Sequence, residues 1–290
     1  MRIYEKMDRL EAVRRRAEIG ICLIGIGIIV FFISMGIFQA EKGMYIGIIL
    51  GVVGGFVFRG THAAYQKIYK DLFVEEPLNK NFENVFYAWR SGFNLDEVND
   101  FNICTKVDKV VSEDYVKADY KGIHFEMSDV KAISNMRHGK NDSGIRFQGR
   151  IIAFDFPDKA VKNTLVYTKP FFYRSKEYAS KQNIVKMEST AFNHDFDVYS
   201  DDAHDVFYLL TPHFMEQLDK LYKKYPKMCI RFTGNKVIVG LDEQAINNSF
   251  DKTAWTIKTT YPEEMAKVQN DIDDIKRIIT MISGDNAEQQ

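Results

Sequence analysis

The sequence lacks a strong charge of either sign. Lysine and arginine together number 39, aspartate and glutamate number 40, and the formal net charge is -1. A dedicated nucleic-acid-binding protein carries a clear excess of basic residues. The charge balance therefore argues against that class, and we expect no nucleic acid among the partners.

Cysteine is scarce, and the common catalytic signatures are absent. The three cysteines, Cys22, Cys104 and Cys229, are widely spaced and include no CxxC pair. They predict no disulfide framework and fit a reducing compartment. The sequence contains no P-loop, no HExxH pair and no GxSxG turn. We therefore expect no cofactor, and a binding role rather than a reaction.

What the chain does contain is a concentration of apolar residues before residue 60. Ile19–Phe38 is a run of twenty residues without a charge. At about 1.5 Å per residue, such a helix spans the ~30 Å hydrocarbon core of a bilayer. The second run, Met44–Phe58, has fifteen residues and can span if Lys42 and Arg59 extend to the two surfaces. A re-entrant segment is the alternative for this second run.

The segment between these runs, Gln39–Gly43, is long enough only for a turn, so the runs predict a two-helix transmembrane hairpin over residues 19–58. Basic residues are numerous before the first run, whereas the turn holds only Lys42. Positive residues stay on the cytoplasmic side. We therefore expect a two-span protein of the inner (plasma) membrane with both termini in the cytoplasm. Residues 1–18 are expected to form an amphipathic cytosolic segment that either lies on the membrane or extends the first span.

Three glycines in the second run, Gly47, Gly51 and Gly55, repeat every four residues. Small residues at this spacing allow helix backbones to approach closely in lipid. The pattern predicts a packing face, either within the hairpin or between the protomers of a homo-oligomer. Frequent glycine in membrane helices would produce the same spacing without such a role.

The remainder of the chain predicts a helical connector over residues 59–95, with one helix over 60–76 that ends at Pro77 and a second over 80–90. Residues 96–283 predict an α+β cytosolic domain, and residues 284–290 a disordered tail. Hairpin signals are strong at Lys121-Gly122 and at Gly234-Asn235. Helices are expected over 211–225 and from Thr260 onward. Further short strands are expected over 145–156 with a bulge at Gly149, and over 163–168, 184–188 and 196–199.

Hairpins without many βαβ units indicate an antiparallel sheet with segregated helices. A pleckstrin-homology-like roll with a packed helix is one concrete form of this α+β class.

An acidic segment supplies the best candidate metal ligands. His194, Asp195, Asp197, Asp201 and Asp202 lie within nine residues, and carboxylates with imidazoles can hold Mg²⁺, Ca²⁺ or Mn²⁺. A metal-dependent hydrolase that uses Asp195, Asp197 and Asp201 is therefore one alternative function. The competing interpretation is a solvated acidic turn before a helix, whose N-terminus favours negative charge.

A second candidate site interleaves aromatic and basic residues. Phe171, Phe172, Tyr173, Arg174 and Lys176 could contact lipid headgroups in a domain held at a bilayer. This predicts a lipid-headgroup-binding module as a further alternative, and core burial of the aromatic side chains is the competing interpretation.

Two stretches resemble a bacterial two-span membrane protein family known only as a domain of unknown function. The first is FQGRIIAFDF over residues 147–156, followed by TLVY from Thr164. The second is FNHDFDVYSDD over 192–202, which continues into YLLTPHFMEQL over 208–218. The resemblance covers roughly residues 60–250. It implies a bacterial source and a membrane location, and it implies no reaction. The family has an acidic residue and Ala-Arg before Tyr208, where this chain has His204-Asp205-Val206-Phe207, so no role is assigned to a basic residue there.

Taken together, these patterns predict a membrane-anchored cytosolic protein-interaction or scaffold module without catalysis. The expected partners are the lipid bilayer and another membrane or cytosolic protein.

Overall fold

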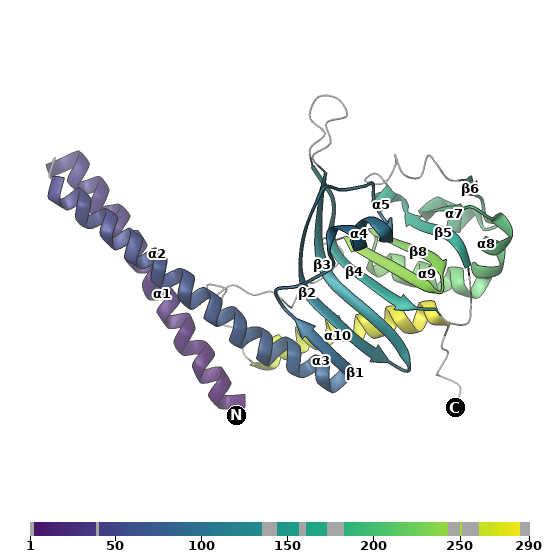
Figure 1. Ribbon diagram of the computed structural model, residues 1–290, viewed down its shortest axis with the longest axis horizontal. Helices are drawn as coiled ribbons and strands as arrows, with labels where there is room; N and C mark the ends of the chain where they lie inside the picture. The colour runs from purple at the N-terminus through teal and green to yellow at the C-terminus, as the bar shows by residue number, and fades with distance from the viewer. Residues whose placement is uncertain are drawn as a thin grey trace. The chain divides into compact units, whose positions relative to one another are not determined.

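The computed structural model describes residues 3–38, 41–134, 144–156, 161–172, 183–242, 250 and 261–284 (Figure 1). The chain divides into two compact units. The hairpin unit comprises Met1–Lys80 and Ser249–Asn270, and the sheet domain comprises Asn81–Asn248 and Asp271–Gln290. The chain therefore leaves the hairpin unit and later returns to it.

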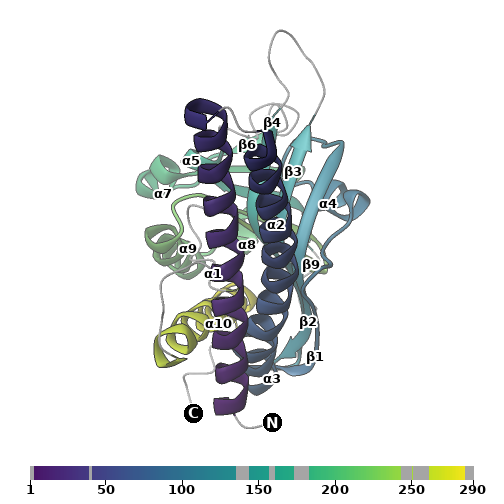
Figure 2. The ribbon, with the colours of Figure 1, turned by 90° about the vertical axis from the view of Figure 1, so that its left-hand side faces the viewer.

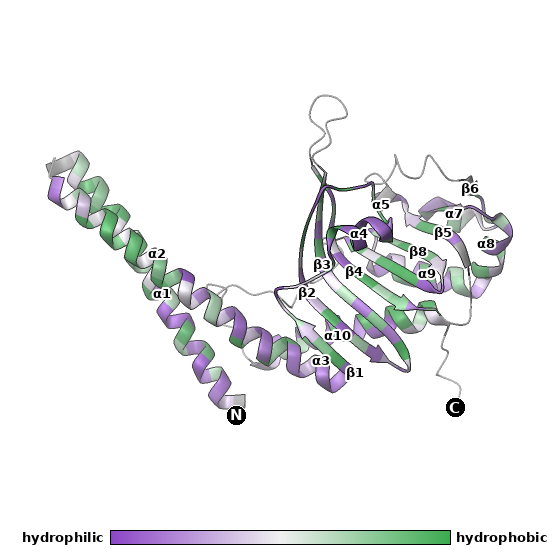
Figure 3. Ribbon diagram, viewed as in Figure 1, coloured by the Kyte–Doolittle hydropathy of each residue, from purple (hydrophilic) through white to green (hydrophobic). Residues whose placement is uncertain are grey.

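Two long helices dominate the hairpin unit. Helix α1 (Ile3–Ile33) continues into a short π-helix, η1 (Ser34–Phe38), and α2 (Glu41–Lys70) runs back beside it. Both helical segments, Tyr4–Gly36 and Glu41–Asn81, are long and apolar enough to cross a membrane. Figure 3 shows the apolar residues gathered in the half of the hairpin that contains the turn. The segment before the first apolar run is part of α1 itself, and the second run lies in one unbroken helix, as a span requires.

Glycines bring the two helices into close contact. Gly20 and Gly27 of α1 are buried, as are Gly47 and Gly54 of α2, and each pair is separated by seven residues. A methyl group added at Gly20 would lie 2.9 Å from the Phe58 nitrogen, which is closer than a side chain can approach a backbone. The observed packing face therefore follows a seven-residue repeat.

The three glycines singled out in the sequence lie differently in this face. Gly47 contacts α1 directly, whereas a methyl group added at Gly51 or Gly55 would meet no atom within 4 Å. The backbone of Gly51 nevertheless lies beside Gly27, whose added methyl group would be 2.8 Å from the Gly51 nitrogen. A role for the open sides of Gly51 and Gly55 in a homo-oligomer stays a prediction.

The helix after α2 does not end at Pro77. It passes through a π-helical turn, η2 (Asp71–Glu75), and continues as α3 (Glu76–Asn81). Proline lacks a backbone N–H and disturbs the helical hydrogen-bond pattern on its N-terminal side. A π turn has already shifted that pattern by one residue, which explains why the helix continues through Pro77. The expected helix over 80–90 is wrong, because residues Glu83–Ala88 form a strand, β1.

The sheet domain is α+β, as the sequence predicted. Its described strands form one antiparallel sheet in the order β1-β2-β3-β4-β9-β8-β5-β7-β6. The order ends at β1 and β6, so the sheet is open and does not close into a roll among these strands. The strand bounds are β2 (Lys109–Tyr120), β3 (Ile123–Ser134), β4 (Gly144–Asp155), β5 (Val161–Thr168), β6 (Asn183–Val185), β7 (Phe196–Ser200), β8 (Met228–Gly234) and β9 (Lys236–Asp242). The helix bounds are α4 (Leu95–Phe101), α5 (Lys169–Phe172), α7 (Thr190–Asp195), α8 (Ala203–Leu209), α9 (Pro212–Lys224) and α10 (Tyr261–Ser283).

Both expected hairpins are confirmed. Lys121 and Gly122 have φ values of 50° and 75° between β2 and β3, as the type I′ turns of tight hairpins require. Gly234, with φ 59°, opens the turn between β8 and β9. The bulge expected at Gly149 is wrong. Gly149 pairs regularly with Val130, and the register shift falls where Ile133 pairs with Ile145 and Ala132 with Phe147, which leaves Arg146 as the extra residue.

Both faces of the sheet are covered (Figures 1 and 2). Helix α4 lies on one face, and a core there includes Val98, Ile151 and Cys229. Helix α9 and the second half of α10 lie on the other face, where Ile152 of β4 is grouped with Ile275 and Ile278 of α10. Burial on both sides explains why Ile151–Phe154 of β4 is apolar without alternation. The helices expected over 211–225 and from Thr260 onward are confirmed, and each buries an apolar stripe made of Leu218 and Leu221 on α9 and of Ile272, Ile275, Ile279 and Ile282 on α10.

Candidate anion-binding pocket

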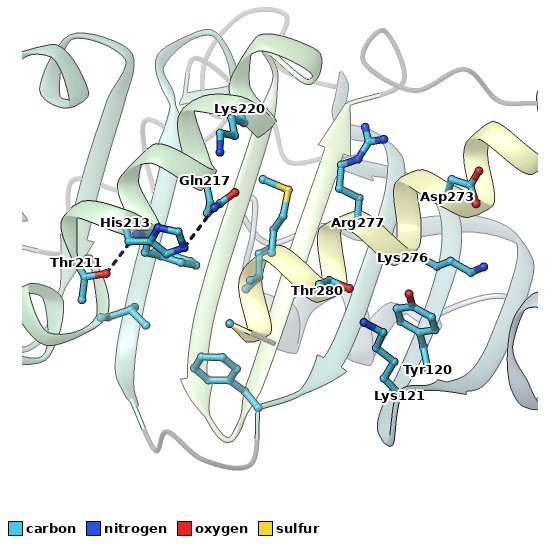
Figure 4. A pocket seen from close by; sticks show the side chains of 16 residues that line it. Tyr120, Lys121, Thr211, His213, Gln217, Lys220, Asp273, Lys276, Arg277 and Thr280 are labelled. Atoms are coloured by element: carbon cyan, nitrogen blue, oxygen red, sulfur yellow. Dashed lines mark hydrogen bonds between the residues drawn. The ribbon is translucent and has the colours of Figure 1, made fainter. Parts of the chain in front are cut away.

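A cavity of about 640 Å³ opens in the sheet domain between α9 and the second half of α10 (Figure 4). Its walls come from the β2–β3 turn, the end of β4, the end of α8, α9 and α10. Pockets that bind small ligands typically measure ~300–1,000 Å³. The lining residues are Tyr120, Lys121, Phe156, Leu209, Thr211, His213, Phe214, Gln217, Lys220, Asp273, Lys276, Arg277, Thr280, Met281, Ile282 and Gly284.

The first turn of α9 forms one wall. Thr211 caps this helix by accepting a hydrogen bond from the backbone nitrogen of Phe214 at 3.2 Å, and Pro212 occupies the first turn. This cap and proline are the features that the sequence predicted. The N-terminus of a helix carries partial positive charge, so the cap places a weakly electropositive end beside Thr211 and His213 at the pocket.

The charged lining is strongly unequal in sign. Four cationic side chains line the cavity, Lys121, Lys220, Lys276 and Arg277, against one carboxylate, Asp273. Within the described part of the chain, neither Lys121 nor Lys220 forms an ion pair. The pocket therefore has a positive field and two ammonium groups that no carboxylate of the described chain neutralises.

The two cations on α10 are held in place by their neighbours. The Lys276 ammonium donates a hydrogen bond to the Asn81 side-chain oxygen at 2.7 Å, and it lies 5.7 Å from the ring centres of both Phe82 and Tyr120. Such cation–π contacts orient an ammonium without removing its charge. Arg277 lies 3.6 Å from the Asp274 carboxylate, measured from a guanidinium nitrogen to an oxygen.

Asp274 of α10 also contacts the C-terminal end of α9. It accepts from Lys224 of α9 and from the Tyr225 hydroxyl. Burial raises the pKa of Tyr225, and the bond to Asp274 raises that pKa further. These contacts join the end of α9 to α10, and therefore fix the separation of the two helices that form the pocket.

The floor of the pocket is apolar. Phe156, Leu209 and Ile282 are almost completely buried, and Phe214 and Met281 are partly buried. Phe156 and Phe214 also pack against Phe232 of β8, with ring centres 5.8 and 6.1 Å apart respectively. The cavity thus combines a cationic rim with an apolar base, and can accommodate an anion together with an apolar group.

The structure spreads the predicted metal residues over several elements. His194 and Asp195 end α7 and contact each other at 2.8 Å, while Asp197 lies on β7, 3.5 Å from the Lys186 ammonium. Asp195 is also a hydrogen-bond partner of Tyr222, whose pKa is raised by burial and by that carboxylate.

The other two acidic residues of the segment have structural partners. Asp201 accepts a hydrogen bond from Asn163 at 3.1 Å, and Asp202 caps α8 by accepting from the backbone of His204 at 2.9 Å. Across the described residues, no three His, Cys, Asp or Glu side chains are grouped as a metal site would require. Metal binding stays a prediction, which calorimetry with Mg²⁺ or Mn²⁺ tests.

The predicted headgroup-contact segment lies largely beyond what the structure describes. Phe171 and Phe172 belong to the short helix α5, and Tyr173, Arg174 and Lys176 fall outside the described residues. Contact of this segment with lipid therefore stays a prediction.

The basic pocket was not foreseen in the sequence, because its lining comes from segments more than 150 residues apart. One signal was present. In a helix whose apolar stripe is otherwise regular, Lys276 and Arg277 are adjacent cations, and Met281 and Ile282 follow as adjacent apolar residues. Only the fold shows that Lys220 of α9 faces the same cavity.

Fold and pocket together define the class, an apolar helical hairpin joined to an α+β domain that carries a basic pocket. Residues 145–283 match the model of the family described as protein of unknown function (DUF3137). This supports the resemblance to a domain-of-unknown-function family. The matched segment contains every pocket-lining residue except Tyr120, Lys121 and Gly284, and does not include the hairpin.

No curated protein matches the chain. Among solved structures, a crystal structure of the mycobacterial trehalose monomycolate transport factor A, TtfA, is similar at 8% sequence identity with a TM-score of 0.37. The similarity covers 75% of this chain and 95% of that one. A likeness at this level does not extend the ligand or role of that protein to this chain.

Proposed function

We propose that this protein is a non-catalytic, membrane-anchored binding module whose cytosolic sheet domain takes up an anionic ligand. The observation that carries the proposal is the basic pocket, with four cationic side chains and one carboxylate around a cavity of about 640 Å³. A positively lined cleft with low-dielectric walls raises the local concentration of anions. Lys220 and Lys121 are the groups best able to take a new negative partner.

Membrane anchoring rests on the two long apolar helices. Arginines and lysines before the first span and after the second support an orientation with both termini on the cytoplasmic side of the inner membrane. Labelling of single cysteines introduced at Lys223 and at Lys42 tests this arrangement in intact cells. A membrane-impermeant maleimide should modify the turn position and leave the sheet-domain position unmodified. Modification of Lys223→Cys in intact cells would exclude the proposed orientation.

Anion binding is tested on the full chain in a neutral detergent by calorimetry with pyrophosphate. We expect saturable binding that weakens at least about tenfold in the Lys220→Ala/Arg277→Ala double variant, because hydrogen bonds to charged groups contribute roughly 1.5–3 kcal/mol each. Lys223→Ala is the matched control, since Lys223 lies on α9 outside the pocket and pairs with Asp219 at 2.7 Å. Absence of saturable binding by the unaltered chain would refute the proposal.

A protein-interaction or scaffold role is the second candidate function. It is favoured by two adjacent exposed aromatic side chains on α8, Phe207 and Tyr208, which are 51% and 72% exposed. Aromatic residues are enriched at protein interfaces. In-cell crosslinking with mass spectrometry should identify a partner that the Phe207→Ala/Tyr208→Ala variant loses. Phe86→Ala, which removes an aromatic residue 57% exposed on β1, should retain it.

A further inference from the structure

We propose that the ligand of the basic pocket is a single-chain amphiphile with a phosphate-like anionic headgroup. This inference rests on the proposed anion-binding function and specifies the chemical class of the ligand. A free inorganic anion would use the cationic rim but not the buried floor. A neutral apolar molecule would use the floor and leave the cations without a partner.

The polarity of the lining changes in one direction along each helix. On α10, Lys276 and Arg277 precede Met281 and Ile282, so charge gives way to apolar surface toward the helix end. On α9 the order is reversed, since Phe214 near the helix start is followed by Lys220.

The order of charged and apolar lining residues along α9 is therefore the reverse of the order along α10. Figure 4 shows Lys220 and Arg277 on the same side of the pocket, with Thr211 and Thr280 farther along it. At 1.5 Å per residue, the six positions from Phe214 to Lys220 and the four from Arg277 to Met281 correspond to roughly 6–9 Å. Lys121 lies on the opposite side of the pocket, beside Tyr120 (Figure 4). The pocket therefore holds one cationic pair, Lys220 and Arg277, and apolar side chains within a distance that a headgroup and the first part of one acyl chain occupy.

The headgroup chemistry follows from the donors of Lys220 and Arg277. An arginine guanidinium and lysine ammonium groups together match a phosphate, which accepts hydrogen bonds on three oxygens. The volume, about 640 Å³, lies in the middle of the range for ligands of small-molecule size, which suits one chain better than two. A domain tethered to a bilayer through the proposed anchor has access to a store of such amphiphiles.

The test uses the full chain in a neutral detergent and displacement of a fluorescent lysophosphatidate. Three competitors separate the headgroup from the chain, namely palmitoyl lysophosphatidate, glycerol phosphate and palmitoyl glycerol. We expect lysophosphatidate to compete at least about tenfold better than either of the other two. Equal competition by glycerol phosphate would overturn the amphiphile inference and leave anion binding intact. Equal competition by palmitoyl glycerol would overturn the headgroup assignment, and absence of lysophosphatidate binding would overturn the amphiphile inference. Only absence of pyrophosphate binding as well would overturn the proposed function.

Variants of the cationic pair and of an apolar lining residue separate the contribution of the headgroup from that of the acyl chain. Lys220→Ala/Arg277→Ala should weaken lysophosphatidate and glycerol phosphate by similar factors of at least about ten. Met281→Gln should weaken lysophosphatidate about three- to tenfold and leave glycerol phosphate unchanged. Met215→Gln is the matched control, because Met215 is a partly buried methionine of α9 that does not line the cavity. Equal effects of Met281→Gln on both ligands would show that the floor does not hold a chain.

Discussion

Gly27 of α1 and Gly47 of α2 face each other so closely that a methyl group on either would lie 2.7 Å from the carbonyl oxygen of the other. The contact is reciprocal and involves backbone atoms on both sides, so no rotamer change can relieve it. It fixes the register of the two helices at this level of the hairpin. Close approach of this kind favours helix association where lipid supplies no hydrophobic force between helices.

Gly27→Val should therefore destabilise the hairpin, by about 1–3 kcal/mol if the helices separate only locally. Gly25→Val is the matched control on the same helix, because an added side-chain atom there meets nothing within 4 Å. Thermal unfolding of the full chain in detergent would measure the difference. An equal loss of stability in both variants would mean that valine acts through helix propensity and not through the interface.

A buried ion pair joins β3 to β4 directly beneath α10. Arg150 and Asp129 are partners in the strand register, and the guanidinium donates to both carboxylate oxygens at 2.8 and 3.1 Å. Burial alone would lower the pKa of Arg150, but the carboxylates of Asp129, Asp271 and Asp114 together outweigh it and raise that pKa. Arg150→Met should cost about 3–5 kcal/mol, because it leaves a carboxylate buried without its partner.

The double variant Asp129→Leu/Arg150→Met tests whether the stability lost in Arg150→Met comes from the carboxylate that is left unpaired. If the cost of Arg150→Met comes from the unpaired charge, removing both groups should be less destabilising than removing the arginine alone. Urea unfolding followed by tryptophan fluorescence would compare the variants. Additive losses would contradict a coupled pair.

The buried thiol of Cys104 predicts sensitivity to alkaline pH. Burial raises its pKa from 9.0 to about 12, so the folded state retains a proton that the unfolded chain releases. The stabilising contribution is complete below pH 9 and is lost as the pH rises toward 12. The free energy of unfolding should fall with pH by at most about 1.4 kcal/mol per unit for this group. Tyr199, whose pKa is also raised to about 12 by burial, adds to the same trend.

Cys104→Ala should make this pH dependence shallower in urea titrations between pH 8 and pH 10.5. A slope equal to that of the unaltered chain in Cys104→Ala would rule out this thiol as a contributor.

Helix α4 depends on a capping box. The Asn94 side chain accepts from the Glu97 backbone at 2.9 Å, and the Glu97 carboxylate accepts from the Asn94 backbone at 2.7 Å. Asn94→Ala should cost about 0.5–2 kcal/mol, whereas Asn94→Ser should cost much less because serine can accept the same bond. Thermal unfolding of the three chains would rank them, and equal losses for alanine and serine would argue against the cap.

Local chemistry explains which parts of the fold could be predicted from the sequence. The hairpin turns at Gly122 and Gly234 and the cap at Thr211 each depend on a few neighbouring residues, and the structure confirms them. The strand β1 was mistaken for a helix because its partner, β2, lies about 30 residues away. Helix α4 was overlooked although Asn94 and Glu97 have the spacing of a capping box.

The candidate site was harder to predict for a related reason. Pocket residues such as Tyr120, Phe156 and Lys220 have no common pattern in the sequence, and only the order of the strands brings them together. The glycine face was predicted at Gly47 with a four-residue repeat. The observed seven-residue repeat depends on Gly20 and Gly27 of the partner helix, which a pattern search within one helix does not compare.

The hairpin unit closes around a segment from near the end of the chain. In that unit Phe73 lies 5.4 Å from Tyr261 between ring centres, and Tyr69 donates to the buried Glu264 at 3.0 Å. The two units therefore cannot be produced separately by cutting the gene once. A truncated product that starts at residue 81 would carry the first ten residues of α10 without the aromatic surface they normally cover. Such a product should be poorly soluble, so the full-length chain is the form in which ligand binding can be measured.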